Sequence, residues 1–241
     1  ARMPTASMSK VMTMYLVFDA LKAGRLKLED ELLVSQRAWE TQGSKMWVPI
    51  NEKVKVEDLI RGVIIQSGND ATIVLAEALA GSEDAFALAM TKRAKEIGME
   101  NSNFKNASGW PDPEHYSTPH DLAIMAQRLI KDFPEYYPYY SEKEFTYHDI
   151  KQGNRNPLLY RNIGVDGVKT GHTEEAGYGL IASAMQDGRR IVGDRFGAVD
   201  LFRIDAVGGK LDATPEILGV HALRFRLGPD MHRGADRNHL E

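Results

Sequence analysis

The chain has 241 residues, of which 43% are hydrophobic and 27% charged, with a formal net charge of −4 at pH 7. This length suits one large or two small soluble domains, and the slightly acidic balance argues against nucleic-acid binding. There is no cysteine, which excludes disulfides, thiolate metal sites and a cysteine nucleophile. The seven histidines are scattered without the spacing of a metal site, so we expect neither a metal nor a cofactor.

The first part of the chain has the apolar spacing of helices. Apolar residues recur every three or four positions from Ser7 and predict a helix that ends by Gly24. Further helices are predicted over residues 56–66, 71–80, 82–97 and 118–133. Ser82 and Thr118 stand at the expected cap positions of the last two. Polar, turn-rich stretches over residues 43–54 and 101–116 predict loops.

Past residue 140 the pattern changes to short strands. Strands are predicted over residues 145–148, 163–169 and 178–184, with another that begins at residue 190. The dipeptide Asp187-Gly188 between the last two strands is a strong hairpin signal. A helical cluster followed by antiparallel strands predicts an α+β fold.

Ser7 and Lys10 have the spacing Ser-x-x-Lys at the start of the first apolar helix. A serine hydroxyl needs a base within hydrogen-bond reach, and residues three apart share one face of a helix. Burial and a second cation can lower the pKa of such a lysine until it accepts a proton. The spacing also arises by chance: Ser102 and Lys105 repeat it in an Asn-rich loop without an apolar helix to bury the lysine.

The segment Ser67-Gly68-Asn69 breaks an otherwise apolar helical stretch. It is either a polar connector between two helices or part of an active site. In an active site, the Ser67 hydroxyl would relay a proton between Lys10 and the leaving group, and Asn69 would donate to a substrate amide.

Lys169, Thr170 and Gly171 close a predicted strand. A cation and a hydroxyl at such an edge can hold a carboxylate, and the glycine lets another backbone approach closely. The alternative is a charged strand end before a turn.

In this order the three motifs occur in penicillin-binding proteins and class A β-lactamases. With their flanks at residues 6–13, 65–71 and 166–173, they resemble the low-molecular-weight penicillin-binding proteins, which are serine-type D-alanyl-D-alanine carboxypeptidases. Lesser similarity at residues 106–111 and 153–156 extends the resemblance over roughly residues 2–192.

The resemblance implies a β-lactamase/transpeptidase-like fold, in which a helical lobe packs on a five-stranded antiparallel sheet. It implies that the protein trims the pentapeptide stem of peptidoglycan through an acyl-enzyme in the periplasm, and that penicillin and other β-lactam antibiotics acylate the same serine. The catalytic residues implied by the family's motifs are Ser7, Lys10, Ser67, Asn69 and Lys169.

The same resemblance implies the residues that bind substrate. Thr170, Gly171 and Arg155 would lie at the substrate carboxylate, beside Lys169. The backbone N–H groups of Ser7 and His172 would form the oxyanion hole.

The chain departs from the family pattern at both ends. Only six residues precede Ser7, where the family has two strands, so we expect an incomplete sheet; we also expect no membrane anchor in this chain. From Asp194 onward there is one lysine against six arginines, with three of the seven histidines. This shift predicts a catalytic domain over residues 1–193 and an atypical tail over residues 194–241. The tail is either out-of-frame sequence or a hairpin around Gly208-Gly209.

Two alternatives to the carboxypeptidase remain. A class A β-lactamase needs a glutamate that activates water, but Glu114 lacks the expected asparagine context and Gly68 stands where that class has aspartate. The second alternative is a catalytically incompetent fragment that keeps the motifs without their geometry.

Overall fold

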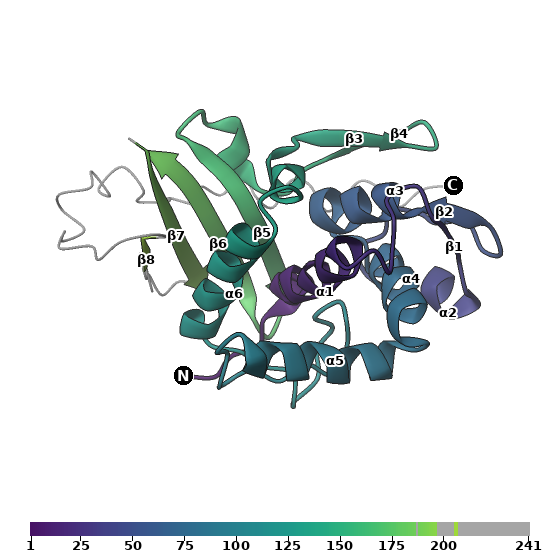
Figure 1. Ribbon diagram of the computed structural model, residues 1–241, viewed down its shortest axis with the longest axis horizontal. Coiled ribbons are helices and arrows are strands. Elements are labelled where there is room, and N and C mark those ends of the chain that lie inside the picture. The colour runs from purple at the N-terminus through teal and green to yellow at the C-terminus, as the bar shows by residue number, and fades with distance from the viewer. Residues whose placement is uncertain (187, 197–204, 207–241) are drawn as a thin grey trace. The chain divides into compact units, whose positions relative to one another are not determined.

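The computed structural model describes residues 1–186, 188–196 and 205–206 (Figure 1). These residues belong to one compact unit, Ala1–Gly208. The expected tail hairpin around Gly208-Gly209 lies outside the described residues, apart from a short strand at residues 205–206. The division of the chain at residue 193 stays a prediction.

The helices lie close to their predicted positions. They are α1 (Lys10–Lys22), α3 (Val56–Arg61), α4 (Asn69–Ala80), α5 (Glu83–Glu96) and α6 (Pro119–Asp132). A further short helix, α2 (Gln36–Glu40), was not predicted. The predicted caps are confirmed, since Ser82 Oγ accepts from the Ala85 N–H and Thr118 Oγ1 from the Asp121 N–H, each at 3.1 Å. Across the described part of the chain, no helix has the length and apolar character needed to cross a membrane.

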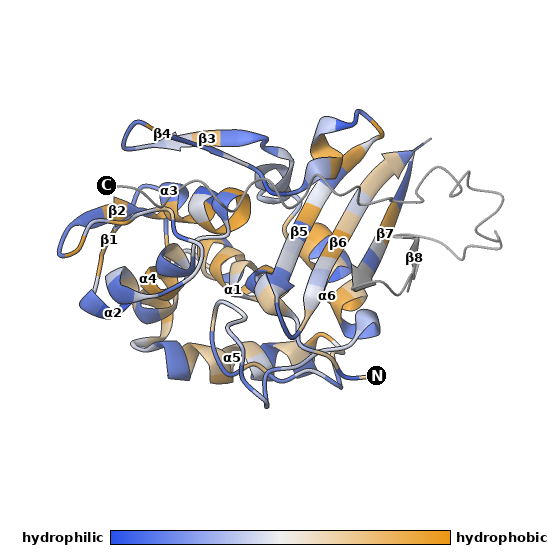
Figure 2. Cartoon of the chain, turned by 180° about the vertical axis from the view of Figure 1, so that it is seen from behind, coloured by the Kyte–Doolittle hydropathy of each residue, from blue (hydrophilic) through white to orange (hydrophobic). Residues whose placement is uncertain are grey.

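Helix α1 forms the centre of the core. Val11, Met12 and Val17, which point in different directions around the helix, are all completely buried. A helix that is apolar on every side must be covered on every side. Figure 1 shows α1 between the sheet strand β5 and helix α4, and in Figure 2 its ribbon is largely orange. Its start differs from the prediction, because residues Ala6–Ser9 form a 3₁₀ turn and the α-helix begins only at Lys10.

The main sheet is antiparallel, in the order β5 (Val165–Thr173), β6 (Gly177–Gln186), β7 (Arg189–Phe196) and β8 (Asp205–Ala206). The predicted hairpin is confirmed by the pairing of Gln186 with Arg189 and by a φ of +75° at Gly188. Helix α6 packs against β6 and β7 (Figure 1). The α+β expectation is therefore confirmed, with four strands in the described part of the sheet where the family resemblance implied five.

Two small two-stranded sheets complete the described fold. Strand β1 (Glu31–Leu33) pairs with β2 (Lys53–Lys55), and β3 (Glu144–Tyr147) pairs with β4 (Ile150–Gly153). Residues 43–54 were predicted as a loop, so β2 was not expected, and neither was β4. Its turn residues His148 and Asp149 both have positive φ, at 46° and 62°, although neither is glycine, so the usual hairpin signal is absent.

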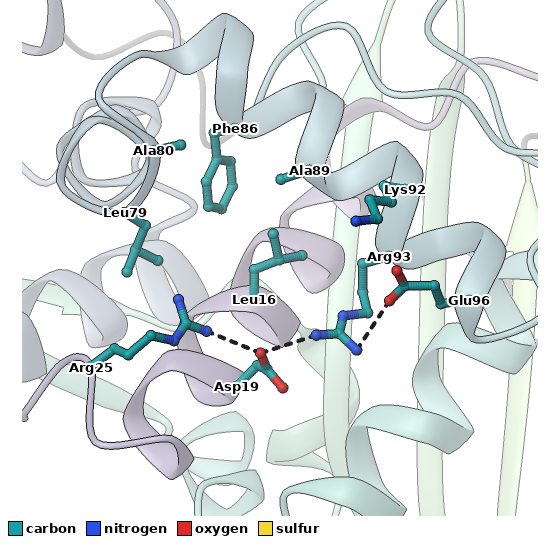
Figure 3. Close-up of a pocket in the computed structure, with 10 residues that line it drawn as sticks. All are labelled: Leu16, Asp19, Arg25, Leu79, Ala80, Phe86, Ala89, Lys92, Arg93 and Glu96. Carbon is teal, nitrogen blue, oxygen red and sulfur yellow. Dashed lines mark hydrogen bonds and ion pairs between the residues drawn. The ribbon is translucent and has the colours of Figure 1, made fainter.

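Ion pairs link α1 to the outer helix α5. Asp19 of α1 accepts from both Arg25 and Arg93 at 3.1 Å, and Arg93 also pairs with Glu96 (Figure 3). These charges line a cavity of about 220 Å³ whose apolar wall includes Phe86. None of the residues that line this cavity is a predicted site residue, so it is separate from the candidate active site.

Candidate active site

Ser7 and Lys10 meet at the N-terminal end of the core helix. Ser7 lies in the 3₁₀ turn and is half-buried, whereas Lys10 is completely buried. The Nζ atom of Lys10 lies 2.9 Å from Ser7 Oγ. Because residues three apart are eclipsed in a 3₁₀ helix, the Ser-x-x-Lys spacing brings the pair together even though Ser7 precedes the α-helix.

The surroundings of Lys10 fit a neutral amine. Its Nζ lies 2.7 Å from Asn69 Oδ1 and 2.8 Å from the Ser108 carbonyl oxygen, and both of these atoms only accept hydrogen bonds. A neutral amine has two hydrogens for these two oxygens and one lone pair left for Ser7 Oγ. Burial lowers the pKa of Lys10 well below its ordinary value, and the charges of Lys169 and Arg155 lower it further.

The Ser67-Gly68-Asn69 segment joins a π-helical turn, Gly62–Gln66, to helix α4. Ser67 has a φ of +65°, so the chain bends sharply there. Asn69 is held at both ends of its amide: Oδ1 accepts from Lys10, and Nδ2 donates to the Gln42 carbonyl at 2.7 Å. One Nδ2 hydrogen remains for the predicted substrate contact.

Asp70, to which the sequence analysis gave no role, anchors the loop beside Asn69. Its buried carboxylate accepts from the backbone N–H groups of Met46, Trp47 and Val48 at 2.9–3.2 Å. These bonds fix the backbone of residues 46–48. The signal in the sequence is a carboxylate within an apolar helical stretch, where an unpaired charge is costly.

Lys169 lies on β5 and points at Ser67. Its buried Nζ donates to Ser67 Oγ at 3.0 Å and to the Thr170 carbonyl at 3.0 Å. Burial lowers the pKa of Lys169 to about 7, with a smaller effect from the charge of Arg155. Ser67 is therefore hydrogen-bonded to Lys169. The predicted proton relay instead linked Ser67 to Lys10.

Gly171 is placed where β5 passes the nucleophile's turn. A Cβ atom on Gly171 would lie 3.1 Å from the backbone nitrogens of both Ser7 and Met8, which is tighter than ordinary packing. The predicted close backbone approach is thus confirmed. Beside it, Thr170 is half-buried and His172 is exposed, with its ring 4.0 Å from that of Tyr178 on β6.

Arg155 lies on the loop after β4, at the rim of the site. Its side chain is exposed and donates to Ser44 Oγ at 2.7 Å. The next residue holds this loop on β5, since Asn156 Nδ2 donates to the Gly167 carbonyl at 3.0 Å. From this position the Arg155 charge lowers the pKa of both Lys10 and Lys169.

The second Ser-x-x-Lys copy does not form a serine–lysine pair. Ser102 Oγ donates to Asp121 at 2.6 Å, and Lys105 forms an exposed ion pair with Glu114 at 3.1 Å. The hydrogen bond to Glu114 raises the pKa of Lys105, the opposite of the effect at Lys10. The carboxylate of Glu114, the glutamate that a β-lactamase would need to activate water, is therefore engaged in the ion pair with Lys105.

The structure brings Ser7, Lys10 and Asn69 into one contact group and Ser67 and Lys169 into another, beside the Gly171 edge. Sequence reasoning missed the Ser108 carbonyl, because a backbone acceptor leaves no side-chain signal. No group of histidine or carboxylate residues in the described ranges has the geometry of a metal site.

Comparison with known proteins gives a consistent result. Residues 1–199 match the family described as D-alanyl-D-alanine carboxypeptidase, Peptidase S11. D-alanyl-D-alanine carboxypeptidase DacA of Haemophilus influenzae is 47% identical over 183 residues, covering 74% of this chain and 47% of the relative. The chain spans about half the length of the curated relatives it matches.

Solved structures agree with the sequence comparison. Penicillin-binding protein 5 of Haemophilus influenzae superposes with a TM-score of 0.79 at 44% identity, covering 83% of this chain and 59% of that one. Penicillin-binding protein D2 of Listeria monocytogenes, solved in its ampicillin-bound form, gives a TM-score of 0.74 at 31% identity, with 82% and 81% covered. Its motifs, its fold and these likenesses together make the chain a member of the Peptidase S11 family of D-alanyl-D-alanine carboxypeptidases.

Proposed function

We propose that this protein is a serine D-alanyl-D-alanine carboxypeptidase that removes the terminal D-alanine from the pentapeptide stem of peptidoglycan. The observation that carries the proposal is the buried amine of Lys10, 2.9 Å from Ser7 Oγ, with two carbonyl oxygens at its other contacts. This arrangement supplies the base that a serine nucleophile requires.

In the acylation step, Ser7 gives its hydroxyl proton to Lys10 Nζ as Oγ attacks the carbonyl carbon of the penultimate D-alanine. The backbone N–H groups of Ser7 and His172 stabilise the oxyanion. The Ser67 hydroxyl gives its proton to the leaving nitrogen and is resupplied from Lys169, which lies 3.0 Å away. Free D-alanine leaves, and the stem remains as an ester of Ser7.

Before deacylation, Lys10 releases to solvent the proton it took from Ser7, and Lys169 regains one, so both amines return to their starting states. In the deacylation step, water attacks the ester carbonyl and gives its proton to the neutral Lys10. The bond to Oγ breaks, Ser7 recovers its proton and the shortened stem leaves with a new carboxylate. Because the same amine serves both half-reactions, a buried and uncharged Lys10 is needed in each of them.

The substrate's terminal carboxylate is assigned to the β5 edge. Lys169 and Thr170 lie next to Gly171 on this edge, and the exposed guanidinium of Arg155 faces the site from the rim. A cation and a hydroxyl together provide strong, charge-assisted bonds to a carboxylate. This assignment explains why the enzyme would select substrates in which a single residue, with a free carboxylate, follows the scissile bond.

β-Lactams are proposed to acylate Ser7 and to remain bound. The ampicillin-bound form of the Listeria relative, whose fold this chain shares, supports this assignment. We also assign the protein to the periplasm, because its proposed substrate is part of the cell wall.

Labelling of the full chain with a fluorescent penicillin tests the proposal. We expect a covalent band with the wild type and with Ser102→Ala, the serine of the second Ser-x-x-Lys copy, and none with Ser7→Ala. Soluble, folded wild-type protein that gives no band would identify an incompetent fragment.

A second assay separates the two enzyme classes. We expect release of D-alanine from diacetyl-Lys-D-Ala-D-Ala together with slow turnover of penicillin. Rapid penicillin hydrolysis without D-alanine release would instead identify a β-lactamase.

A further inference from the structure

The backbone directly ahead of Ser7 is in an unfavourable conformation. Ala6 is buried and has a φ of +47°, a region that residues other than glycine rarely adopt. Its carbonyl lies against Gly109, where any Cβ atom would overlap it. Such a conformation persists only where neighbouring groups hold it in place.

Two hydroxyl groups, one on each side of Ser7 in the sequence, help to keep this backbone conformation in place. Ser9 is completely buried, and its Oγ lies 2.5 Å from Thr5 Oγ1. The contact closes a small loop around Ala6 and Ser7, so the position of Ser9 sets the turn that carries Ser7. Neither hydroxyl has a part in the proposed chemistry.

Ser9 is held in turn by His115, which lies 106 positions later in the chain. His115 Nε2 lies 2.7 Å from Ser9 Oγ, and the imidazole is buried. The other ring nitrogen, Nδ1, accepts from the backbone N–H of Lys105 at 3.2 Å. Because Nδ1 is the acceptor, the proton is on Nε2 and is donated to Ser9.

The loop that carries His115 also contacts the base. The Ser108 carbonyl accepts from Lys10, and Thr13 Oγ1 of α1 donates to the Ala107 carbonyl at 2.6 Å. One loop therefore reaches the nucleophile's turn through His115 and the base through Ser108. A shift at either contact changes the distance between Ser7 Oγ and Lys10 Nζ.

We propose that His115 is a positioning residue for acylation: its neutral, Nε2-protonated ring holds Ser9 and so keeps Ser7 against Lys10. The inference rests on the proposed function of Ser7. A second proton on the ring would lie on Nδ1 and meet the Lys105 N–H, so the charged ring cannot keep both contacts. Burial lowers the pKa of His115 to about 4; the nearby Asp112 carboxylate opposes this change and the charge of Lys10 adds to it.

Acylation rate constants of matched variants test the proposal. We expect His115→Phe, which keeps a ring without a donor, to be acylated by benzylpenicillin roughly tenfold more slowly, as a small misplacement of the nucleophile produces. His115→Gln retains a donor and should recover most of the rate. His120→Phe at an exposed histidine is the control. A wild-type rate in His115→Phe, or equal losses in the Phe and Gln variants, would overturn the proposal.

A double-mutant cycle checks that His115 acts through Ser9. Ser9→Ala and His115→Phe should each slow acylation, and the double variant should be no slower than the worse single variant. Thermal unfolding of each variant shows whether the protein remains folded at the assay temperature. Losses that multiply in the double variant would contradict a shared pathway.

Nitrogen NMR separates this inference from the proposed function. At pH 7 the imidazole of His115 should carry its proton on Nε2, and the Nε2 signal should shift in Ser9→Ala. This readout needs no acylation. A wild-type protein that penicillin fails to acylate would reject the proposed function, and the NMR spectrum would still report the protonation state of His115. An Nδ1-protonated or charged ring at pH 7 would reject the positioning role.

Discussion

The charge of Lys169 lowers the pKa of Lys10, although each amine points at a different serine. Both side chains are buried, and the exposed guanidinium of Arg155 acts on both in the same direction. Burial is the larger cause at both lysines, and the neighbouring positive charges add to it, so the site favours an uncharged Lys10. A lone lysine in an apolar pocket would lack this mutual effect.

Arg155→Gln should move the pH profile of acylation to higher pH. Removing a positive charge makes the protonated lysines less unfavourable, so the pKa of Lys169 rises from about 7 and that of Lys10 rises with it. The rate of penicillin acylation, measured from pH 5 to 10, should reach half its maximum at a higher pH in the variant. Arg25→Gln, in the cavity beside α5, should leave the midpoint unchanged.

Stability should decrease in mild acid because of His115. Its pKa is about 4 in the folded protein against 6.5 for a free histidine, so between these values the unfolded chain binds more protons. The free energy of unfolding should therefore fall as pH decreases from 6.5 to 4, by about 3 kcal/mol for this group. Urea unfolding at both pH values measures the loss, and a profile equally steep in His115→Phe would contradict the assignment.

Asp70→Ala should weaken the fold more than an ordinary surface change. Three backbone N–H groups of residues 46–48 lose their acceptor, and we expect a loss of about 3 kcal/mol in the free energy of unfolding. Glu135→Ala, at an exposed carboxylate in a turn, is the control and should change it by less than about 0.5 kcal/mol. Similar losses in the two variants would show that the Asp70 bonds contribute little.

Gly171→Ala should slow acylation while leaving the protein folded. The added methyl carbon would lie 3.1 Å from the Ser7 nitrogen, so the turn and β5 must separate slightly. A shift of this size corresponds to roughly a tenfold slower reaction. The control is Gly153→Ala, whose nearest new contact is 3.6 Å away at the Tyr160 hydroxyl. If both variants acylate at the wild-type rate, the close approach does not matter for catalysis.

Much of the fold follows from local signals in the sequence. The caps at Ser82 and Thr118 and the hairpin at Gly188 were predictable because each depends on a few adjacent residues. Strand β4 was not, since its turn uses His148 and Asp149 at positive φ and lacks the glycine that usually marks such a turn. Its stability comes from the surrounding structure, which a local pattern does not contain.

The candidate site divides in the same way. The motifs identified Ser7, Lys10 and Lys169 because the chemistry needs these side chains at fixed spacings. They did not identify the Ser108 carbonyl or the link from His115 to Ser9, which join segments about a hundred residues apart. Such contacts depend on how the loop over residues 101–117 packs on α1, and only the folded chain shows that.

The central position of α1 also has a consequence for hydrogen exchange. This helix contacts α4, α5, α6 and β5, so its amides can reach solvent only when those neighbours separate. The amides after Lys10 should then exchange at the rate of global unfolding, slower than those of the small β3–β4 sheet. Heat or urea should accordingly inactivate the protein in step with the loss of its tertiary structure, because the proposed base is attached to the most protected segment of the chain.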